Sequence, residues 1–284
     1  MGVEAGAAAI LNAPEQPIPQ TVREQALGLL LADHPEAAEL ARTLLLRANE
    51  ITPNDASIVL RLGMLAETTS EQEMLYRRTL MLAPDWSHAR QTLAQFLYDN
   101  NRFMETLELT SGHAHDSIEL NELHARALLR VGRYDESAAA YAQTLAALEE
   151  PPPWLFYYKW MAENAAGLHE AAAASAQTAI ERYTDDPSWY VQLCVSLTAM
   201  GKIKEARQAI KQAQSAGIGA LDMLEMSYTI AWNKNDLPET LAIIEQALEL
   251  NPDNDDQALS IWERRRLRLL IELDRIDDVH QLLA

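Results

Sequence analysis

Hydrophobic positions recur along the chain at the spacing of amphipathic helices, and the helices come in pairs. The segment 118–151 contains two such stretches, separated by a short turn that begins at Gly132. Turns of the same kind begin at Gly167, Gly201 and Asn235, at successive intervals of 35, 34 and 34 residues. Glycine and asparagine both tolerate the left-handed backbone that ends a helix. The pattern therefore predicts an array of helix pairs that repeats about every 34 residues.

A second landmark is a helix end that is followed by proline. An apolar residue stands two positions before Pro53, Pro84 and Pro252, and Asp or Asn follows each proline directly. Proline stops a helix, and Asp or Asn suits the cap or turn that leads into the next one. The three sites therefore mark boundaries between successive helix pairs.

The composition supports an all-α chain. Alanine and leucine, which favour helices, are abundant, whereas 284 residues include only 10 Gly and 12 Pro. The net charge of −19 argues against nucleic-acid binding, which requires clustered Lys and Arg. The single cysteine cannot form an internal disulfide, and no apolar run is long enough to span a membrane. We expect a cytoplasmic protein that neither binds nucleic acid nor inserts into a membrane.

The helix pairs resemble tetratricopeptide repeats (TPRs), most clearly in the segments 60–68, 131–145 and 246–254. In that family each 34-residue unit consists of two antiparallel helices, with small residues where the helices cross. Alanines occupy these crossing sites here: Ala41, Ala48, Ala172, Ala179, Ala206, Ala213 and Ala247.

The resemblance implies an all-α, right-handed superhelical solenoid of about eight helix pairs over residues 20–284. The pairs are expected at 20–53, 54–84, 85–112, 116–151, 152–186, 187–216, 219–252 and 254–284. Residues 1–19, which contain three prolines, are expected to form an N-terminal linker. The last helix is expected to start near Ile276, so the last repeat is predicted to be incomplete or uncapped.

Two units depart from the family pattern. The second lacks about three residues in the turn between Glu67 and Glu71. The second helix of the third unit is expected to break near Ser111 and Gly112.

In a TPR array the groove is lined by the first helix of each pair, and this face supplies the predicted binding residues. The third pair offers His88, Gln91, Thr92, Gln95 and Tyr98. The predicted peptide- or partner-binding residues of the whole chain are Trp154, Tyr157, Tyr158, Met161, Tyr98, Trp232, Arg264, Arg265 and Arg268.

Two of these groups stand out in the sequence. The segment 151–160 holds five of the eighteen aromatic residues, too many for one helix to bury, so some are expected to form a peptide-binding platform. The alternative is that the rings fill gaps between alanine-rich helices. The segment 264–268 holds four arginines, which suit a carboxylate or phosphate ligand. The alternative there is a solvated helix face balanced by nearby acidic residues.

No combination of residues indicates catalysis, a cofactor or a metal. His113, His115 and Asp116 lie in an expected loop without further ligands at metal-binding spacing. The segment 253–256 lacks the glycine turn and the distal Glu of a calcium loop. Cys194 lies in an apolar helical stretch, which is typical of a small buried residue. We expect a protein that is not an enzyme.

The resemblance favours a protein–protein interaction scaffold that binds a peptide or a partner helix in its groove. Two alternatives stay open. The chain can be the substrate-presenting arm of a larger glycosyltransferase, sulfotransferase or oxygenase, or it can assemble into a homo-oligomer through its uncapped C-terminal repeat.

Overall fold

The computed structural model describes residues 35–250 and 261–283, and these residues form α-helices joined by turns, one of them a short 3₁₀ segment, with no strand among them. The chain divides into two units, Met1–Gly132 (unit 1) and Arg133–Ala284 (unit 2). The predicted linker 1–19, the first helix of the first pair and the segment 253–256 lie outside the described residues. The expected all-α solenoid is confirmed for the part of the chain that is described.

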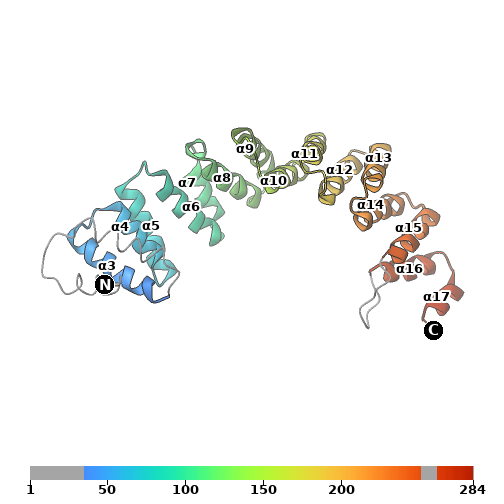
Figure 1. Ribbon diagram of the computed structural model, residues 1–284, viewed down its shortest axis with the longest axis horizontal. Coiled ribbons are helices and arrows are strands. Elements are labelled where there is room, and N and C mark those ends of the chain that lie inside the picture. The colour runs from blue at the N-terminus through green and yellow to red at the C-terminus, as the bar shows by residue number, and fades with distance from the viewer. Residues whose placement is uncertain (1–34, 251–260, 284) are drawn as a thin grey trace. The chain divides into compact units, whose positions relative to one another are not determined.

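Unit 1 is a run of helices in which each packs on the next (Figure 1). Its described helices are α3 (Pro35–Ile51), α4 (Ala56–Met64), α5 (Thr69–Leu82), α6 (Ser87–Asp99), α7 (Phe103–Thr110) and α8 (Ile118–Arg130). The helix α6 packs on α5, α7 and α8. As predicted, α7 ends just before Ser111.

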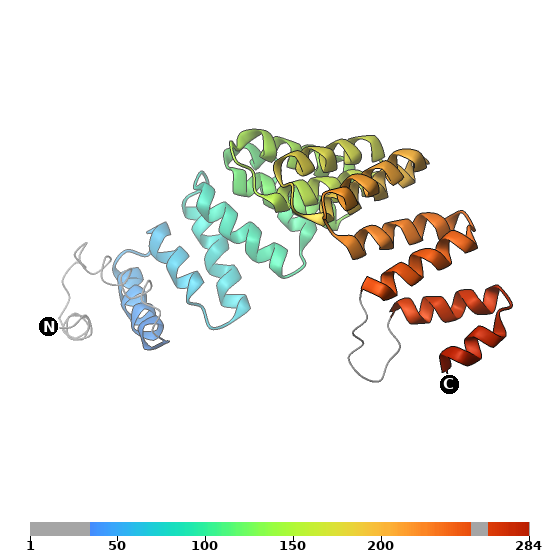
Figure 2. The same ribbon diagram turned by 45° about the vertical axis from the view of Figure 1, so that its right-hand side comes forward.

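Unit 2 continues the same alternation of helices, which Figure 2 shows from a second side. Its described helices are α9 (Tyr134–Ala147), α10 (Pro153–Ala165), α11 (His169–Arg182), α12 (Pro187–Ala199), α13 (Ile203–Ser215), α14 (Ala220–Asn233), α15 (Leu237–Leu250), α16 (Ile261–Glu272) and α17 (Ile276–Leu283). The even-numbered helices from α4 onward are the first helices of the pairs and the odd-numbered ones the second. The helix α17 starts at Ile276, which is the start predicted from the sequence.

The predicted turns contain left-handed residues. The backbone angle φ is +80° at Gly132, +75° at Gly167, +72° at Gly201 and +56° at Asn235. Glycine adopts this conformation without strain, and asparagine is one of the few other residues that tolerates it. The 34-residue spacing read from the sequence is therefore the spacing of these helix ends.

The helices approach each other closely at small residues. Ala41, Ala172, Ala179 and Ala206 are fully buried, in agreement with their prediction as crossing sites. Gly63 marks an even closer approach, since a methyl group on its Cα would lie 2.6 Å from the ring of Tyr76. Burial of small side chains lets two helices pack at the density of a protein interior.

Ion pairs join second helices that are one repeat apart. In unit 1 Arg102 of the α6–α7 turn bonds Glu73 of α5 at 2.7 Å and Glu105 of α7 at 2.6 Å. In unit 2 Arg207 of α13 holds Glu239 of α15 through both carboxylate oxygens. The bond from Arg102 lowers the pKa of Glu73, and the bond from Arg207 lowers that of Glu239. These side chains are about one-quarter to two-fifths exposed, so water screens the pairs and each adds only modestly to stability.

A buried polar network joins α10 to α11. The Lys159 ammonium donates to Glu163 Oε1 and to Ser175 Oγ, both at 2.5 Å, and the Ser175 hydroxyl donates to Glu163 Oε2 at 2.6 Å. Glu163 is only 4 % exposed. Each of these three side chains therefore has a hydrogen-bond partner, as a low-dielectric interior requires.

This network leads to a prediction about stability. In a Glu163→Ala variant, the Lys159 ammonium loses its counter-charge in a mostly buried site, which should lower the free energy of unfolding by about 3 kcal/mol. Thermal and urea unfolding followed by circular dichroism would measure the change. The double variant Lys159→Met/Glu163→Leu, which removes both charges, should lose much less. If Glu163→Ala is as stable as wild type, the buried charge pair does not stabilise the fold and the prediction is wrong.

Candidate functional site

The aromatic run of the sequence folds into the first three turns of α10. Pro153 opens the helix, where the missing N–H of proline costs no hydrogen bond. The helical period then divides the rings between two sides. Leu155 and Phe156 are buried, whereas Trp154 and Tyr157 are 40 % and 43 % exposed. Phe156 therefore fills the core, whereas Trp154 and Tyr157 face solvent.

Trp154, Tyr157, Tyr158 and Met161 are here called the α10 aromatic surface. Tyr158 stacks on Tyr141 of α9 at 5.8 Å between ring centroids, and the rings of Tyr157 and Trp154 pack edge-on against Tyr158 at 5.6 and 6.2 Å. Tyr158 and Met161 are half-buried. Contacts of this kind hold rings in place before any ligand arrives, which lowers the entropic cost of binding.

Predicted residues near the C-terminal end form a second group, on α14 and α16. Trp232 stacks on Tyr228 at 5.9 Å, and the Arg268 guanidinium lies 5.1 Å from the Trp232 ring centroid. Arg265 lies between Tyr228 and Trp262, at 4.3 and 4.6 Å from their ring centroids. Such cation–π contacts fix the planes of the guanidinium groups.

The arginines of this group have different partners. Arg265 holds Glu225 of α14 through two hydrogen bonds of 2.5 and 2.7 Å, which raise the pKa of the guanidinium. The side chain of Arg268 is 70 % exposed and donates to Glu272 at 3.3 Å. Arg264 is exposed and has no ion pair among the described residues. Arg265 therefore serves an internal contact, while Arg264 and Arg268 face solvent.

The remaining predicted residue, Tyr98, lies in unit 1 in a similar setting. Its ring packs edge-on against Phe103 at 5.2 Å, and Arg126 of α8 lies 4.5 Å from its centroid. Sequence reasoning did not identify Phe103, Tyr228 or Trp262 as partners in these stacks. One signal in the sequence could have indicated these contacts. An aromatic residue on one first helix is followed by an arginine on the next first helix, as with Tyr98 and Arg126 or Trp232 and Arg268.

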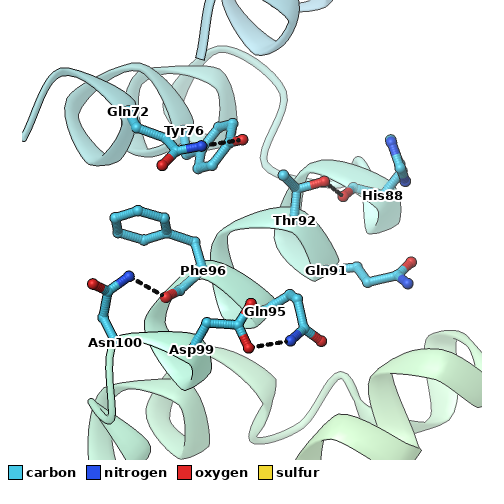
Figure 3. Close-up of a pocket in the computed structure, with 9 residues that line it drawn as sticks. All are labelled: Gln72, Tyr76, His88, Gln91, Thr92, Gln95, Phe96, Asp99 and Asn100. Carbon is cyan, nitrogen blue, oxygen red and sulfur yellow. Dashed lines mark hydrogen bonds between the residues drawn. The ribbon is translucent and has the colours of Figure 1, made fainter. Parts of the chain in front are cut away.

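A cleft of about 400 Å³, lined by both polar and aromatic side chains, lies between α5 and α6 in unit 1 (Figure 3). The α5 side contributes Gln72 and Tyr76, and the α6 side contributes His88, Gln91, Thr92, Gln95, Phe96, Asp99 and Asn100. Four of the five groove positions expected on this helix thus line one cleft, and Tyr98 lies outside it. The contribution from α5 was not predicted, because the sequence pattern assigned the groove to first helices alone.

The surroundings of several reactive side chains in the described residues can be stated individually. Burial raises the pKa of Cys194 to about 12, so the nucleophilic thiolate is scarce at neutral pH. Ser175 and Lys159 are adjacent, but both donate hydrogen bonds to Glu163, so the carboxylate occupies the side chains that could form a nucleophile and its base. His113 and Asp116 bond each other at 2.8 Å, and no cluster of three or more metal-ligating side chains occurs in the described ranges.

None of the helices in the described part of the chain combines the length and apolar character needed to cross a bilayer.

Comparison with solved structures identifies the fold as that of tetratricopeptide-repeat proteins. The C-terminal part of a TPR repeat-containing protein from Cytophaga hutchinsonii superposes with a TM-score of 0.60 at 10 % identity, over 83 % of this chain and 96 % of that one. A tetratricopeptide repeat protein from Parabacteroides merdae gives 0.52 at 11 % identity, over 89 % and 98 %. The expected TPR-like fold is confirmed.

A third similar structure is Naa15/Naa10 bound to HypK-THB, with a TM-score of 0.55 at 16 % identity. The alignment covers 86 % of this chain but only 38 % of that one. No protein-family model and no curated protein matches the sequence. The structural likeness therefore defines the fold, and any inference about function has to come from the chain's own residues.

The environment of Cys194 gives a prediction about reactivity. At pH 8 an ordinary cysteine is partly ionised, whereas a thiol with a pKa of about 12 should be alkylated more than about a thousandfold more slowly. Iodoacetamide labelling followed by mass spectrometry would measure the rate. The same protein in concentrated urea is the control and should react at the ordinary rate. Rapid labelling of the folded protein would contradict the buried position.

Proposed function

We propose that this protein is a non-catalytic scaffold that binds a protein partner through the exposed faces of its first helices. The α10 aromatic surface is the main contact of this proposal. Its support is the exposure of Trp154 and Tyr157, two large rings that lie beside half-buried rings on one helix. Tryptophan and tyrosine are enriched among the residues that contribute most to protein–protein affinity.

Arg264 and Arg268 add a second, charged contact for the partner. The face of the Arg268 guanidinium lies against Trp232, which leaves its edge N–H groups directed toward solvent or Glu272. A planar edge of this kind suits a carboxylate on the partner. Arg265 is assigned to the support of this contact, because both of its terminal nitrogens bond Glu225.

The fold neighbours support the class of function. One of them was solved as Naa15/Naa10 bound to HypK-THB, an assembly of several proteins. Stacked helix pairs present extended surfaces on which such partners bind. Self-assembly and substrate presentation to a linked enzyme are the alternatives, and sedimentation of the purified chain as a monomer at tens of micromolar would exclude self-assembly.

A double variant tests the aromatic surface. Partners are first identified by affinity purification with wild type and mass spectrometry, and one is then purified. Trp154→Ala/Tyr157→Ala should weaken its binding by about thirtyfold or more, since each ring removes contact area typical of a binding hot spot. Both side chains lie at the surface and outside the core, so the variant should stay folded with only a small fall in melting temperature, measured by circular dichroism.

The control removes exposed apolar side chains elsewhere. Met81 and Met104 are 75 % and 59 % exposed on the second helices α5 and α7. Met81→Ala/Met104→Ala should leave the affinity unchanged. The proposal fails if the aromatic variant binds the partner as tightly as wild type, or if both double variants weaken binding equally.

A further inference from the structure

A cavity of about 290 Å³ opens where α9, α10 and α11 of unit 2 meet. The residues that α10 contributes to it are Phe156, Lys159 and Glu163. With 3.6 residues per turn, these positions lie roughly 180° around the helix from the α10 aromatic surface. The second helices α9 and α11 supply the rest of the lining. The cavity is therefore separate from the first-helix face that the proposed function uses.

Apolar side chains from all three helices line the cavity. They are Leu145 of α9, Phe156 of α10, and Ala171 and Ala174 of α11. An apolar cavity of about 150 Å³ holds one benzene molecule. The space of about 290 Å³ therefore accepts a molecule whose apolar body is one ring with a short substituent. The two alanines keep this space open, because larger side chains at their positions would occupy it.

The polar part of the lining is the network of Lys159, Glu163 and Ser175. Glu163 and Ser175 are 4 % and 6 % exposed, and both carboxylate oxygens and the serine hydrogen are used within the network. The Lys159 ammonium has three N–H groups, of which Glu163 and Ser175 accept two. No group among the described residues accepts the third. Thr178 adds no donor, because its hydroxyl donates to the Ala174 carbonyl at 2.9 Å. The cavity thus offers one donor, and that donor is charged.

The charges of the network decide which kind of acceptor fits. Lys159 and Glu163 neutralise each other, and no other Lys or Arg lines the cavity. A carboxylate ligand would add a second negative charge beside Glu163, which is buried and little screened by water. An ammonium ligand would compete with Lys159 for carboxylate oxygens that already accept hydrogen bonds. A carbonyl oxygen accepts the third N–H without adding charge.

We propose that this cavity binds a small, uncharged molecule that consists of one ring and a carbonyl group. The carbonyl oxygen accepts the third N–H of Lys159, and the ring lies against Leu145 and Phe156. Apolar pockets in which a few polar groups fix the orientation are the usual form of small-molecule sites. A buried ion pair adds little net stability compared with apolar side chains of similar size, which agrees with a role in binding. The site goes beyond the proposed function and does not depend on it.

Three probes of nearly equal size test the proposal on the full chain. Acetophenone has the ring and the carbonyl, ethylbenzene lacks the acceptor, and benzoate carries a charge. NMR titration of the ¹⁵N-labelled protein would measure each affinity. Acetophenone should bind with a dissociation constant of about 1 mM or tighter, about tenfold more tightly than ethylbenzene and also more tightly than benzoate.

Two variants locate the bound probe. Lys159→Met/Glu163→Leu removes the donor and keeps the apolar wall, so acetophenone should bind only as tightly as ethylbenzene, whose own affinity should not fall. Ala174→Phe fills the cavity from an exposed position on α11 and should weaken acetophenone by about tenfold or more. The control Ala139→Phe adds the same side chain at an exposed position of α9 outside the cavity and should leave the affinity unchanged.

The proposal is overturned if acetophenone does not bind at millimolar concentration, if benzoate binds more tightly, or if Ala174→Phe binds acetophenone like wild type. These results are independent of the α10 aromatic surface. Trp154→Ala/Tyr157→Ala should bind acetophenone like wild type, and Ala174→Phe should bind the protein partner like wild type. If Trp154→Ala/Tyr157→Ala loses acetophenone, the probe occupies the aromatic surface and the cavity is not its site.

Discussion

Close approach of helices at small side chains is the constraint on which the rest of this structure depends. Ala172, Ala179 and Ala206 are fully buried in unit 2, and Gly63 in unit 1 touches the ring of Tyr76 so closely that a methyl group would not fit. Alanine contributes little apolar area by itself, so stability comes from the many neighbouring contacts that its small size allows. Each helix consequently relies on the helices next to it, as in other repeat proteins.

That mode of packing determines where large side chains can go. Small residues occupy the crossing sites, and several bulky aromatic residues lie on first helices, where Trp154 and Tyr157 remain exposed. Elsewhere an arginine from the following first helix covers a ring, as Arg126 covers Tyr98 and Arg268 covers Trp232. These contacts join successive first helices and also orient side chains toward solvent. The proposed binding surfaces therefore follow from the same repeat that builds the fold.

Local signals made the fold predictable, whereas long-range contacts limited prediction of the site. Glycine and asparagine at the turns depend only on their own backbone and were identified at Gly132, Gly167 and Asn235. The equivalent turn at Asn101 was missed because it does not lie within a conspicuous repeat. The pairing of Arg265 with Glu225, 40 residues earlier, and the entry of Gln72 into the α6 cleft both depend on packing that spacing along one helix cannot reveal.

Native-state hydrogen exchange on an Ala179→Leu variant tests the central claim, that stability here is the sum of contacts between neighbouring helices. The larger side chain cannot fit at the fully buried crossing site on α11. The account predicts that amide protection falls in α10, α11 and α12, while α4, α5 and α6 of unit 1 keep the protection of wild type. An equal loss of protection in every helix of both units would show a single cooperative structure and would contradict the account.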